Sequence, residues 1–300
     1  MSLLRKAKLA SRALFDPRYR YLYRQRSIVD PERRERMAAK VIAGLPAVEP
    51  CETEAGRTLA EDGIVFLDGL ISPEQVNAMS VYFTGAPARD PYRPKYGEFS
   101  APECAPAKSH VAFIRDDWVV SAPGAIELAN HPVVLNAVSQ FLGAKPTISY
   151  MAAWWSLPAM DGPEGPENYH RDWDDYRFVK LFLYLTDVDL DSGPHGFVRG
   201  SHKSLRLTQR RRYSEEEVEE AFSDPADRMI ITGSKGTHFL ETTAGVHRGF
   251  PPKRKKRLIF QVLYSLTPYI GGPRAPVYRL PPHRRSGLDP YTNRIYCSFD

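Results

Sequence analysis

The feature that most constrains the fold is a change in the spacing of apolar residues near position 147. Before that point, apolar residues in 132–142 recur at helical spacing, and Gly143 is placed to end the helix. After it come runs rich in β-branched and aromatic residues, which favour strands. These runs cover 148–155, 178–186 and 257–264, and turn signals lie at 161–165, 191–194 and 249–252.

The order of these elements predicts the fold class. Helices precede the strands in bulk, and neither a strand–helix alternation nor a glycine-rich phosphate loop is found in the sequence. This pattern favours a mainly β fold, an antiparallel sandwich or barrel with helices packed outside it.

Three further segments are assigned locally. Residues 63–67 form a short apolar run that predicts a buried strand. The helix that follows is expected to run to about Phe83. Ser72 is its cap, Pro73 suits its first turn, and Gln75 completes a capping box with Ser72. Residues 85–108 are rich in proline, glycine and charge and are expected to form a long irregular loop. Residues 212–228 are expected to contain a short acidic helix.

Composition excludes several classes of protein. The chain has 300 residues, of which 42% are hydrophobic, so a disordered protein is excluded. The sequence has no run of about 18 apolar residues, which excludes an integral helical membrane protein. It has no export signal, and its three cysteines, Cys51, Cys104 and Cys297, form neither a CxxC pair nor an even set. A cytoplasmic location is expected.

The positive charge is concentrated at the N-terminus. Residues 1–40 hold twelve Lys/Arg against four Asp/Glu, a net charge of +8, which leaves −3 for the remaining chain. Because aromatic and leucine side chains are interspersed, this basic arm suits peripheral contact with an anionic membrane; a solvated leader that packs a few aromatics on the body is the alternative. Nucleic acid is disfavoured, since the sequence contains no zinc-finger, RNP or helix-turn-helix pattern.

The segment that indicates chemistry contains His170 and Asp172. In extended backbone, side chains two residues apart emerge from the same face, so an imidazole and a carboxylate can reach one point. Two histidines and one carboxylate leave three positions open on a non-haem Fe(II) ion. The candidates for the second histidine are His195, His202, His238, His247 and His283. His247 is preferred, and His238 is the fallback.

A basic residue that follows His247 suggests an anion site. Arg257 heads the strand 257–264, and its guanidinium could hold a dicarboxylate with two parallel hydrogen bonds. The preceding residues are also basic, so Arg254 is an alternative; strand parity favours Arg257.

Together these motifs resemble the phytanoyl-CoA dioxygenase family of Fe(II)/2-oxoglutarate-dependent oxygenases. The resemblance rests on 63–75, His170-x-Asp172, 191–202 and His247 with Arg257, in that order, and extends over about 57–266. It implies a double-stranded β-helix, or jelly roll, in which His170, Asp172 and His247 bind iron and Arg257 binds the distal carboxylate of 2-oxoglutarate. We therefore divide the chain into a basic N-terminal arm (1–56), a dioxygenase domain (57–266) and a C-terminal extension packed on or near it (267–300).

The resemblance also implies a reaction. Because the carboxylate of Asp172 is present where halogenating relatives have a small residue, hydroxylation is favoured, with release of succinate and CO2. The expected substrates are dioxygen and a small molecule or a lipid- or glycan-linked group with an unactivated carbon. A jelly-roll binding module without catalysis is the alternative function. Candidate substrate contacts are Trp155, Trp173, Tyr176, His195 and Arg199.

Overall fold

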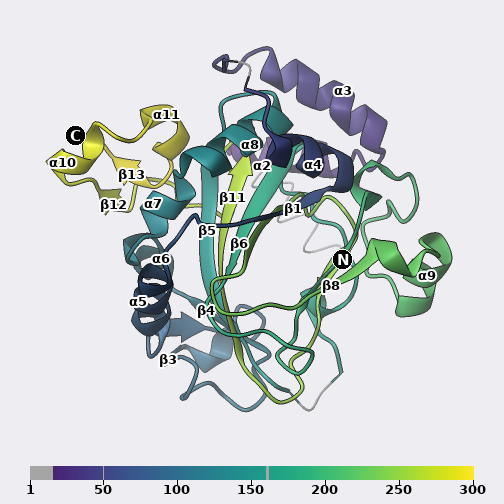
Figure 1. The fold of residues 1–300 in the computed structure, drawn as a ribbon, viewed down its shortest axis with the longest axis vertical. Coiled ribbons are helices and arrows are strands. Elements are labelled where there is room, and N and C mark those ends of the chain that lie inside the picture. Colours follow the sequence, from purple (N-terminus) through teal and green to yellow (C-terminus); the bar gives the residue numbers. More distant parts are fainter. Residues whose placement is uncertain (1–15, 50, 160–161) are drawn as a thin grey trace.

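The computed structural model describes residues 16–49, 51–159 and 162–300, and its central feature is a pair of antiparallel sheets (Figure 1). The large sheet has eight strands in the order β1 (Ile64–Leu67), β9 (His238–Glu241), β6 (Phe178–Tyr184), β11 (Arg257–Ser265), β5 (Thr147–Ser156), β4 (Val111–Ile114), β2 (Pro87–Arg89) and β3 (Glu98–Ser100). The small sheet has the order β10 (His247–Gly249), β7 (His195–Val198) and β8 (Arg228–Ile231). The prediction of a mainly β fold with flanking helices is confirmed.

The central strands β9, β6 and β11 of the large sheet are buried on both faces. Their side chains alternate between the two faces. Trp155, Leu181 and Phe260 point to one face and join the main core beneath the helices. Phe182 and Ile259 point to the other face, where a second cluster lies beside the small sheet. The interior of the molecule therefore consists of a helix–sheet layer and a sheet–sheet layer.

Helices cover the first of these faces. Apolar side chains from four helices that follow β1 along the chain enter the main core, as do Ala38 and Leu59 from helices that precede it. The four helices that follow β1 are α5 (Pro73–Phe83), α6 (Asp116–Ser121), α7 (Ala125–Ala129) and α8 (Pro132–Leu142). In Figure 1, α5, α6 and α7 lie on the opposite side of the large sheet from β8.

Local signals in the sequence set the ends of these helices. The Ser72 side chain accepts a hydrogen bond from the backbone N–H of Gln75, and the reciprocal bond is present, so the predicted capping box is confirmed. Gly143 ends α8 with a φ of 70°, a left-handed conformation that glycine adopts without strain.

The prediction of an irregular loop over 85–108 is wrong in part. This segment contains β2, β3 and a 3-10 turn, η1 (Pro94–Tyr96), because β2 pairs with β4 and extends the large sheet at its edge. The expected acidic helix within 212–228 is present as α9 (Glu215–Ala221). Three other 3-10 turns are η2 (Gly165–Glu167), η3 (Ser201–Lys203) and η4 (Pro225–Asp227).

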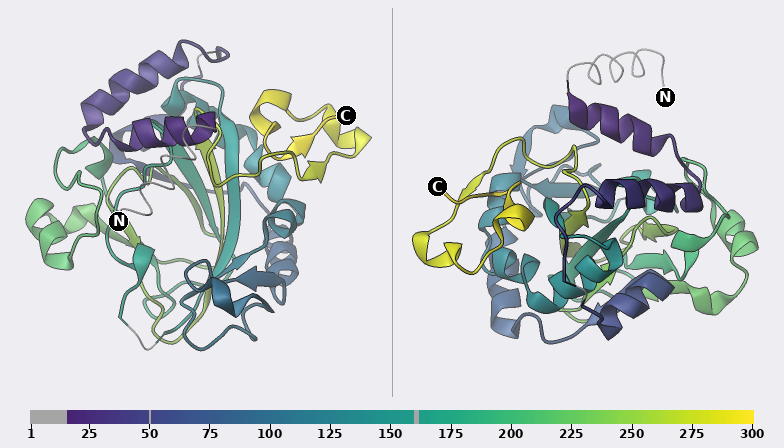
Figure 2. Two further views of the ribbon diagram at one scale, coloured as in Figure 1. Left: turned by 180° about the vertical axis from the view of Figure 1, so that it is seen from behind. Right: turned by 90° about the horizontal axis from the view of Figure 1, so that it is seen from above.

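The N-terminal region folds onto the body of the protein. Helices α2 (Pro17–Arg26) and α3 (Pro31–Ile42) lie together at one end of the sheets (Figures 1 and 2), and α4 (Glu54–Asp62) precedes β1. Tyr21 packs edge-on against Tyr176, with ring centroids 5.6 Å apart. The first part of the predicted basic arm, 1–15, lies outside the described residues.

The last residues form a small unit beside β5 and α7. It consists of β12 (Tyr278–Arg279), α10 (Pro282–Arg285), α11 (Pro290–Asn293) and β13 (Cys297–Ser298). The Tyr296 hydroxyl accepts a hydrogen bond of 2.7 Å from the backbone N–H of Met151, and Asn293 exchanges side-chain hydrogen bonds with Asn130.

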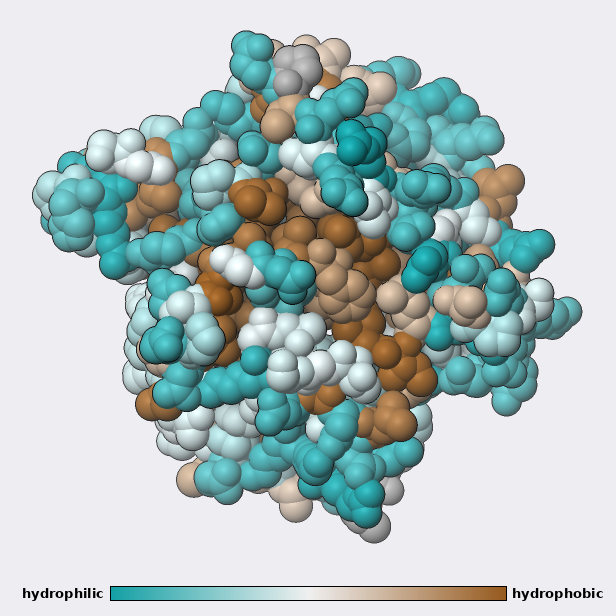
Figure 3. Space-filling view, viewed as in Figure 1, coloured by the Kyte–Doolittle hydropathy of each residue, from teal (hydrophilic) through white to brown (hydrophobic). Residues whose placement is uncertain are grey.

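On the face seen in Figure 3, hydrophobic residues gather at the centre and hydrophilic residues surround them. Among the described helices, none has the length and apolar character needed to cross a membrane.

Burial predicts a large difference between two leucines. Leu181 is fully buried between the large sheet and its helices, whereas Leu190 is 61% exposed. We expect Leu181→Ala to lower the free energy of unfolding by about 2–5 kcal/mol, because a cavity replaces the side chain, and Leu190→Ala to change it by less than about 0.5 kcal/mol. Urea denaturation checks both values; equal effects would contradict the assigned layers.

Candidate metal centre

The three predicted metal ligands come together between the two sheets. The Nε2 atom of His170 lies 3.6 Å from Oδ1 of Asp172, and the Nε2 atom of His247 lies 3.4 Å from Oδ2. One ligand atom from each residue lies within 4.8 Å of the others, so the group could hold one metal ion. Both imidazoles are buried.

Backbone hydrogen bonds bring these ligands together from distant parts of the sequence. The N–H of His170 donates to the carbonyl of His247, and the N–H of His247 donates to the carbonyl of His170, both at 2.9 Å. The N–H of Asp172 donates to the carbonyl of Thr243 at 2.8 Å. The segment containing His170 and Asp172 is therefore aligned with β10 before any metal is considered.

The two imidazoles are prepared for coordination. Nδ1 of His170 lies 2.9 Å from the Asn168 carbonyl, and Nδ1 of His247 lies 3.0 Å from the Gly245 carbonyl. Because a carbonyl only accepts, each Nδ1 carries the hydrogen and each Nε2 keeps its lone pair. Burial, together with the neighbouring His247, holds the pKa of His170 well below its usual value, so it is neutral. These donors fit Fe(II).

The carboxylate of Asp172 is held by a buried lysine that the sequence analysis did not identify. Nζ of Lys180 lies 2.6 Å from Oδ2 of Asp172 and 3.0 Å from Oδ2 of Asp174. Burial opposes ionisation of Asp172, but Lys180 and the two histidines outweigh it and hold the pKa of Asp172 well below its usual value. A signal was available, because Lys180 is the one charged residue in an otherwise apolar and aromatic strand.

A cavity of about 310 Å³ opens beside the three ligands. One wall is aromatic, and Phe113 stacks on Trp154 with centroids 5.2 Å apart. The other aromatic residues that line it are Tyr92, Tyr150, Phe182, Phe250 and Tyr269. Polar lining residues include His110, Glu164, Glu167, Lys180 and Gln261.

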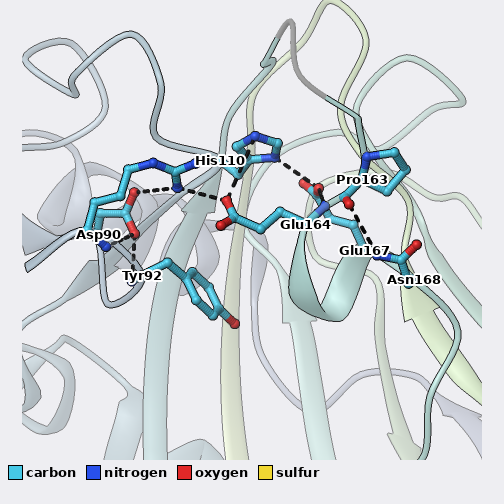
Figure 4. Close-up of polar contacts among 8 residues, drawn as sticks. Asp90, Tyr92, His110, Pro163, Glu164, Glu167 and Asn168 are labelled. Atoms are coloured by element: carbon cyan, nitrogen blue, oxygen red, sulfur yellow. Dashed lines mark hydrogen bonds and ion pairs between the residues drawn. The ribbon is translucent and has the colours of Figure 1, made fainter. Parts of the chain in front are cut away.

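A polar cluster in this cavity wall holds the segment that leads to His170 (Figure 4). Nδ1 of His110 lies 2.9 Å from Oε2 of Glu167, and Arg93 joins Oε2 of Glu164 at 2.7 Å and Oδ2 of Asp90 at 3.3 Å. Glu167 belongs to η2, three residues before His170, so these contacts fix the cavity wall next to the first ligand. The sequence analysis missed this cluster, whose members come from three separate segments.

His195 lies in the cavity, as predicted, beside a buried carboxyl group. Its ring stacks near that of His247, with centroids 5.7 Å apart, and its Nε2 lies 2.9 Å from Oε2 of Glu241. Burial lowers the pKa of His195 to about 3 and raises the pKa of Glu241 to about 8. Near neutral pH both groups are therefore mostly uncharged.

The structure separates the two arginines proposed for the cosubstrate. Arg257 is buried, lines the cavity and donates to Oγ of Ser156 at 3.0 Å and to the Gly193 carbonyl. Its Nε has no hydrogen-bond partner among the described residues. The Arg254 side chain is 78% exposed and pairs with Asp191 on the surface. Arg257 is thus the arginine placed to meet an anion in the cavity.

Two predicted aromatic contacts belong to another part of the molecule. Trp173 and Tyr176 are buried near α3, where the Arg34 guanidinium lies 4.7 Å and 5.5 Å from their ring centroids. Trp173 is adjacent to Asp172, and neighbouring residues of extended backbone point to opposite faces. Tyr176 lies in the bend that covers 174–177, where the alternation has ended. Neither residue lines this cavity, but both line a separate one that also borders Asp172, and their role as substrate contacts stays a prediction.

Two other candidate substrate contacts, Trp155 and Arg199, and the fallback metal ligand, His238, also lie away from the cavity. Trp155 packs in the helix-covered core, because its neighbour Trp154 occupies the cavity face of β5. The side chain of Arg199 is 46% exposed, and its Nη1 lies 3.9 Å from Asp62. His238, the fallback ligand, is on the opposite face of β9 from Phe239, which belongs to the sheet–sheet cluster, and its Nδ1 lies 2.7 Å from the Gly236 carbonyl.

Two histidines and a carboxylate at one point between antiparallel sheets define the site type of a non-haem iron enzyme. A family model supports this class: the phytanoyl-CoA dioxygenase (PhyH) model matches residues 59–250, and the chain belongs to this family. No curated protein matches the sequence.

Solved structures share the fold at low sequence identity. EctD from S. alaskensis with 2-oxoglutarate and 5-hydroxyectoine is 16% identical, with a TM-score of 0.50 over 74% of this chain and 82% of that chain. HygX from Streptomyces hygroscopicus with nickel, 2-oxoglutarate and hygromycin B is 14% identical, with a TM-score of 0.49 over 83% of this chain and 98% of that chain. Of the expected cofactors, 2-oxoglutarate is present in that EctD structure, and the group of His170, Asp172 and His247 in this chain could hold a metal ion.

The buried pair of His195 and Glu241 predicts a pH dependence of stability. Above pH 6.5 the unfolded chain has released the Glu241 proton, whose ordinary pKa is 4.5, while the folded protein keeps it until about pH 8. Stability from this group therefore falls as pH rises from 6.5 to 8, by about 1.4 kcal/mol per unit at most.

Glu241→Gln removes this titration and keeps a hydrogen-bond donor. We expect the variant to lose less stability than the parent protein between pH 6.5 and 8. His195 titrates near pH 6.5 in the unfolded chain of both proteins, so its contribution cancels in the comparison. Urea denaturation of metal-free protein at the two pH values measures the difference. Parallel pH curves for the two proteins would contradict the raised pKa of Glu241.

Proposed function

We propose that the protein is an Fe(II)/2-oxoglutarate-dependent oxygenase that hydroxylates an unactivated carbon of a small molecule or of a lipid- or glycan-linked group. The observation that carries this proposal is the meeting of His170, Asp172 and His247 in a cavity that Arg257 also lines. When bound, iron, 2-oxoglutarate and dioxygen supply oxidation of a C–H bond, with succinate and CO2 as co-products. The polypeptide's tasks are binding, orientation and exclusion of water.

His170, Asp172 and His247 would hold the metal from one side. Their hydrogen bonds to the Asn168 and Gly245 carbonyls and to Lys180 fix the orientation of all three ligands. The remaining side of the metal would face the cavity, where cosubstrate and substrate can approach.

Arg257 would bind the distal carboxylate of 2-oxoglutarate. Its guanidinium is buried, and Ser156 lies beside it with a hydroxyl that could contact the same anion. A planar guanidinium suits a carboxylate because two N–H groups can donate in parallel.

The aromatic wall would hold the substrate. Trp154, Phe113 and Tyr92 offer flat apolar surfaces, and the volume of about 310 Å³ suits a small molecule or the end of a larger one. His195, beside His247, lies close enough to the proposed metal for a substrate contact.

The first test concerns the metal ligands. Protein loaded anaerobically with Fe(II) and 2-oxoglutarate should show a visible charge-transfer band, and Asp172→Ala should abolish it because one of three ligands is lost. Asp172→Asn provides a variant of equal size, and Asp68→Ala, at an exposed position, should leave the band unchanged. An unchanged band in both Asp172 variants would contradict the proposal. Binding of both ligands without succinate formation under oxygen, across a substrate screen, would favour the binding module.

The second test concerns the cosubstrate. We expect Arg257→Met to raise the 2-oxoglutarate concentration for half-maximal band intensity at least tenfold, because the loss of hydrogen bonds to a charged group costs about 1.5–3 kcal/mol. Arg254→Met is the matched control, since that side chain is on the surface. Equal sensitivity of the two variants would overturn the assignment of Arg257.

A further inference from the structure

We propose that the pair of helices α2 and α3 is a positioning element of the metal centre, acting through Gln25 and Arg34 on the backbone that follows Asp172. Both residues lie outside 59–250, the part of the chain that matches the family. The proposal rests on the proposed function in one respect, the role of Asp172 as a metal ligand.

The backbone after Asp172 is irregular until β6 begins, so two of its carbonyl groups depend on side chains for hydrogen bonds. The Trp173 carbonyl accepts from Nε2 of Gln25 and, at 3.2 Å, from Nε of Arg26. The Asp175 carbonyl accepts from Nη2 of Arg34. All three donors come from α2 and α3.

Arg34 is the centre of this contact. It is only 5% exposed, and its Nη1 donates to the carbonyls of Gln25 at 2.9 Å and Ile28 at 3.0 Å. Its guanidinium also lies over the ring of Trp173. Removing the guanidinium would leave several buried carbonyl groups without a partner, which costs more than the bonds themselves contribute.

The Asp175 side chain is held from the same direction. The Tyr21 hydroxyl donates to Oδ1 of Asp175 at 2.6 Å, and the backbone N–H of Thr267 donates to Oδ2 at 2.7 Å. Residues 173–175 are thus held through two carbonyl groups, whose side-chain donors come from the N-terminal helices, and through the Asp175 carboxylate, which accepts from Tyr21, Thr267 and the backbone N–H of Tyr176.

These contacts bear directly on the metal ligand. Trp173 stands between Asp172 and Asp174, whose carboxylates share Nζ of Lys180. A shift of the Trp173 backbone therefore changes the position of both carboxylates around the lysine. A second cavity, of about 420 Å³, borders Arg34, Trp173 and Asp172, so apolar packing does not fill this region and the polar contacts must hold it.

Arg34→Met is the main experiment, with Arg33→Met as the matched control on the exposed face of the same helix. Anaerobic Fe(II) titration at saturating 2-oxoglutarate, followed by the charge-transfer band, gives the metal affinity. We expect a tenfold or greater loss of Fe(II) affinity in Arg34→Met and a change of less than twofold in Arg33→Met, since partners of metal ligands typically contribute 10–100-fold.

Gln25→Ala keeps the test decisive if Arg34→Met does not fold. It removes one donor to the Trp173 carbonyl and leaves the Arg26 donor, so we expect a smaller loss, about threefold or more. Circular dichroism and thermal unfolding of the metal-free variants establish that each is folded at the temperature of the titration.

The outcomes separate this proposal from the proposed function. Absence of the band in the unmodified protein would overturn the function and this proposal together. A normal band in the unmodified protein, with folded Arg34→Met or Gln25→Ala binding Fe(II) as tightly, would overturn only the positioning role. A weakened Fe(II) affinity in folded variants, with Arg33→Met unchanged, would establish it.

Discussion

The site depends on one reciprocal contact, the pair of backbone hydrogen bonds between His170 and His247. Two hydrogen bonds in opposite directions fix both distance and orientation, so the imidazoles face each other with ring centroids 4.2 Å apart. Because the small sheet carries His247 and the N–H of Asp172 bonds to Thr243, the separation of the sheets also sets the size of the cavity.

The interior holds several ionisable groups, and the cost of burying their charges is offset in two different ways. Lys180 neutralises charge between Asp172 and Asp174, and the pKa of Asp172 is held well below its ordinary value. His195 and Glu241 instead avoid charge, since burial shifts their pKa values in opposite directions. The ionised Asp172 beside Lys180 therefore supplies negative charge where a metal cation would bind, while His195 and Glu241 add no charge behind it.

Sequence reasoning named the three residues that the structure brings together, because part of their constraint is local. His170-x-Asp172 needs only alternate positions in extended backbone, and the order of motifs supplied His247. It failed for Trp155, since the parity of a strand buried on both faces cannot be determined from an apolar run alone. Trp173 was grouped with the cavity aromatics although, as the neighbour of Asp172, it lies on the opposite face of extended backbone. Lys180 could have been found, since an unpaired lysine within an apolar strand requires a buried partner.

The N-terminal helices show why contacts between distant segments could not be predicted from the sequence. Net charge described residues 1–40 as a basic arm suited to anionic surfaces, yet Arg34 directs its charge inward, onto backbone carbonyls and an indole ring. Composition counts a buried arginine and an exposed one equally, although burying the first requires that each N–H find a partner. The partners of Arg34 include Asp175, 141 residues away, so its role follows from the tertiary fold and from no local pattern. A region outside the family match can therefore determine the geometry of a site inside it.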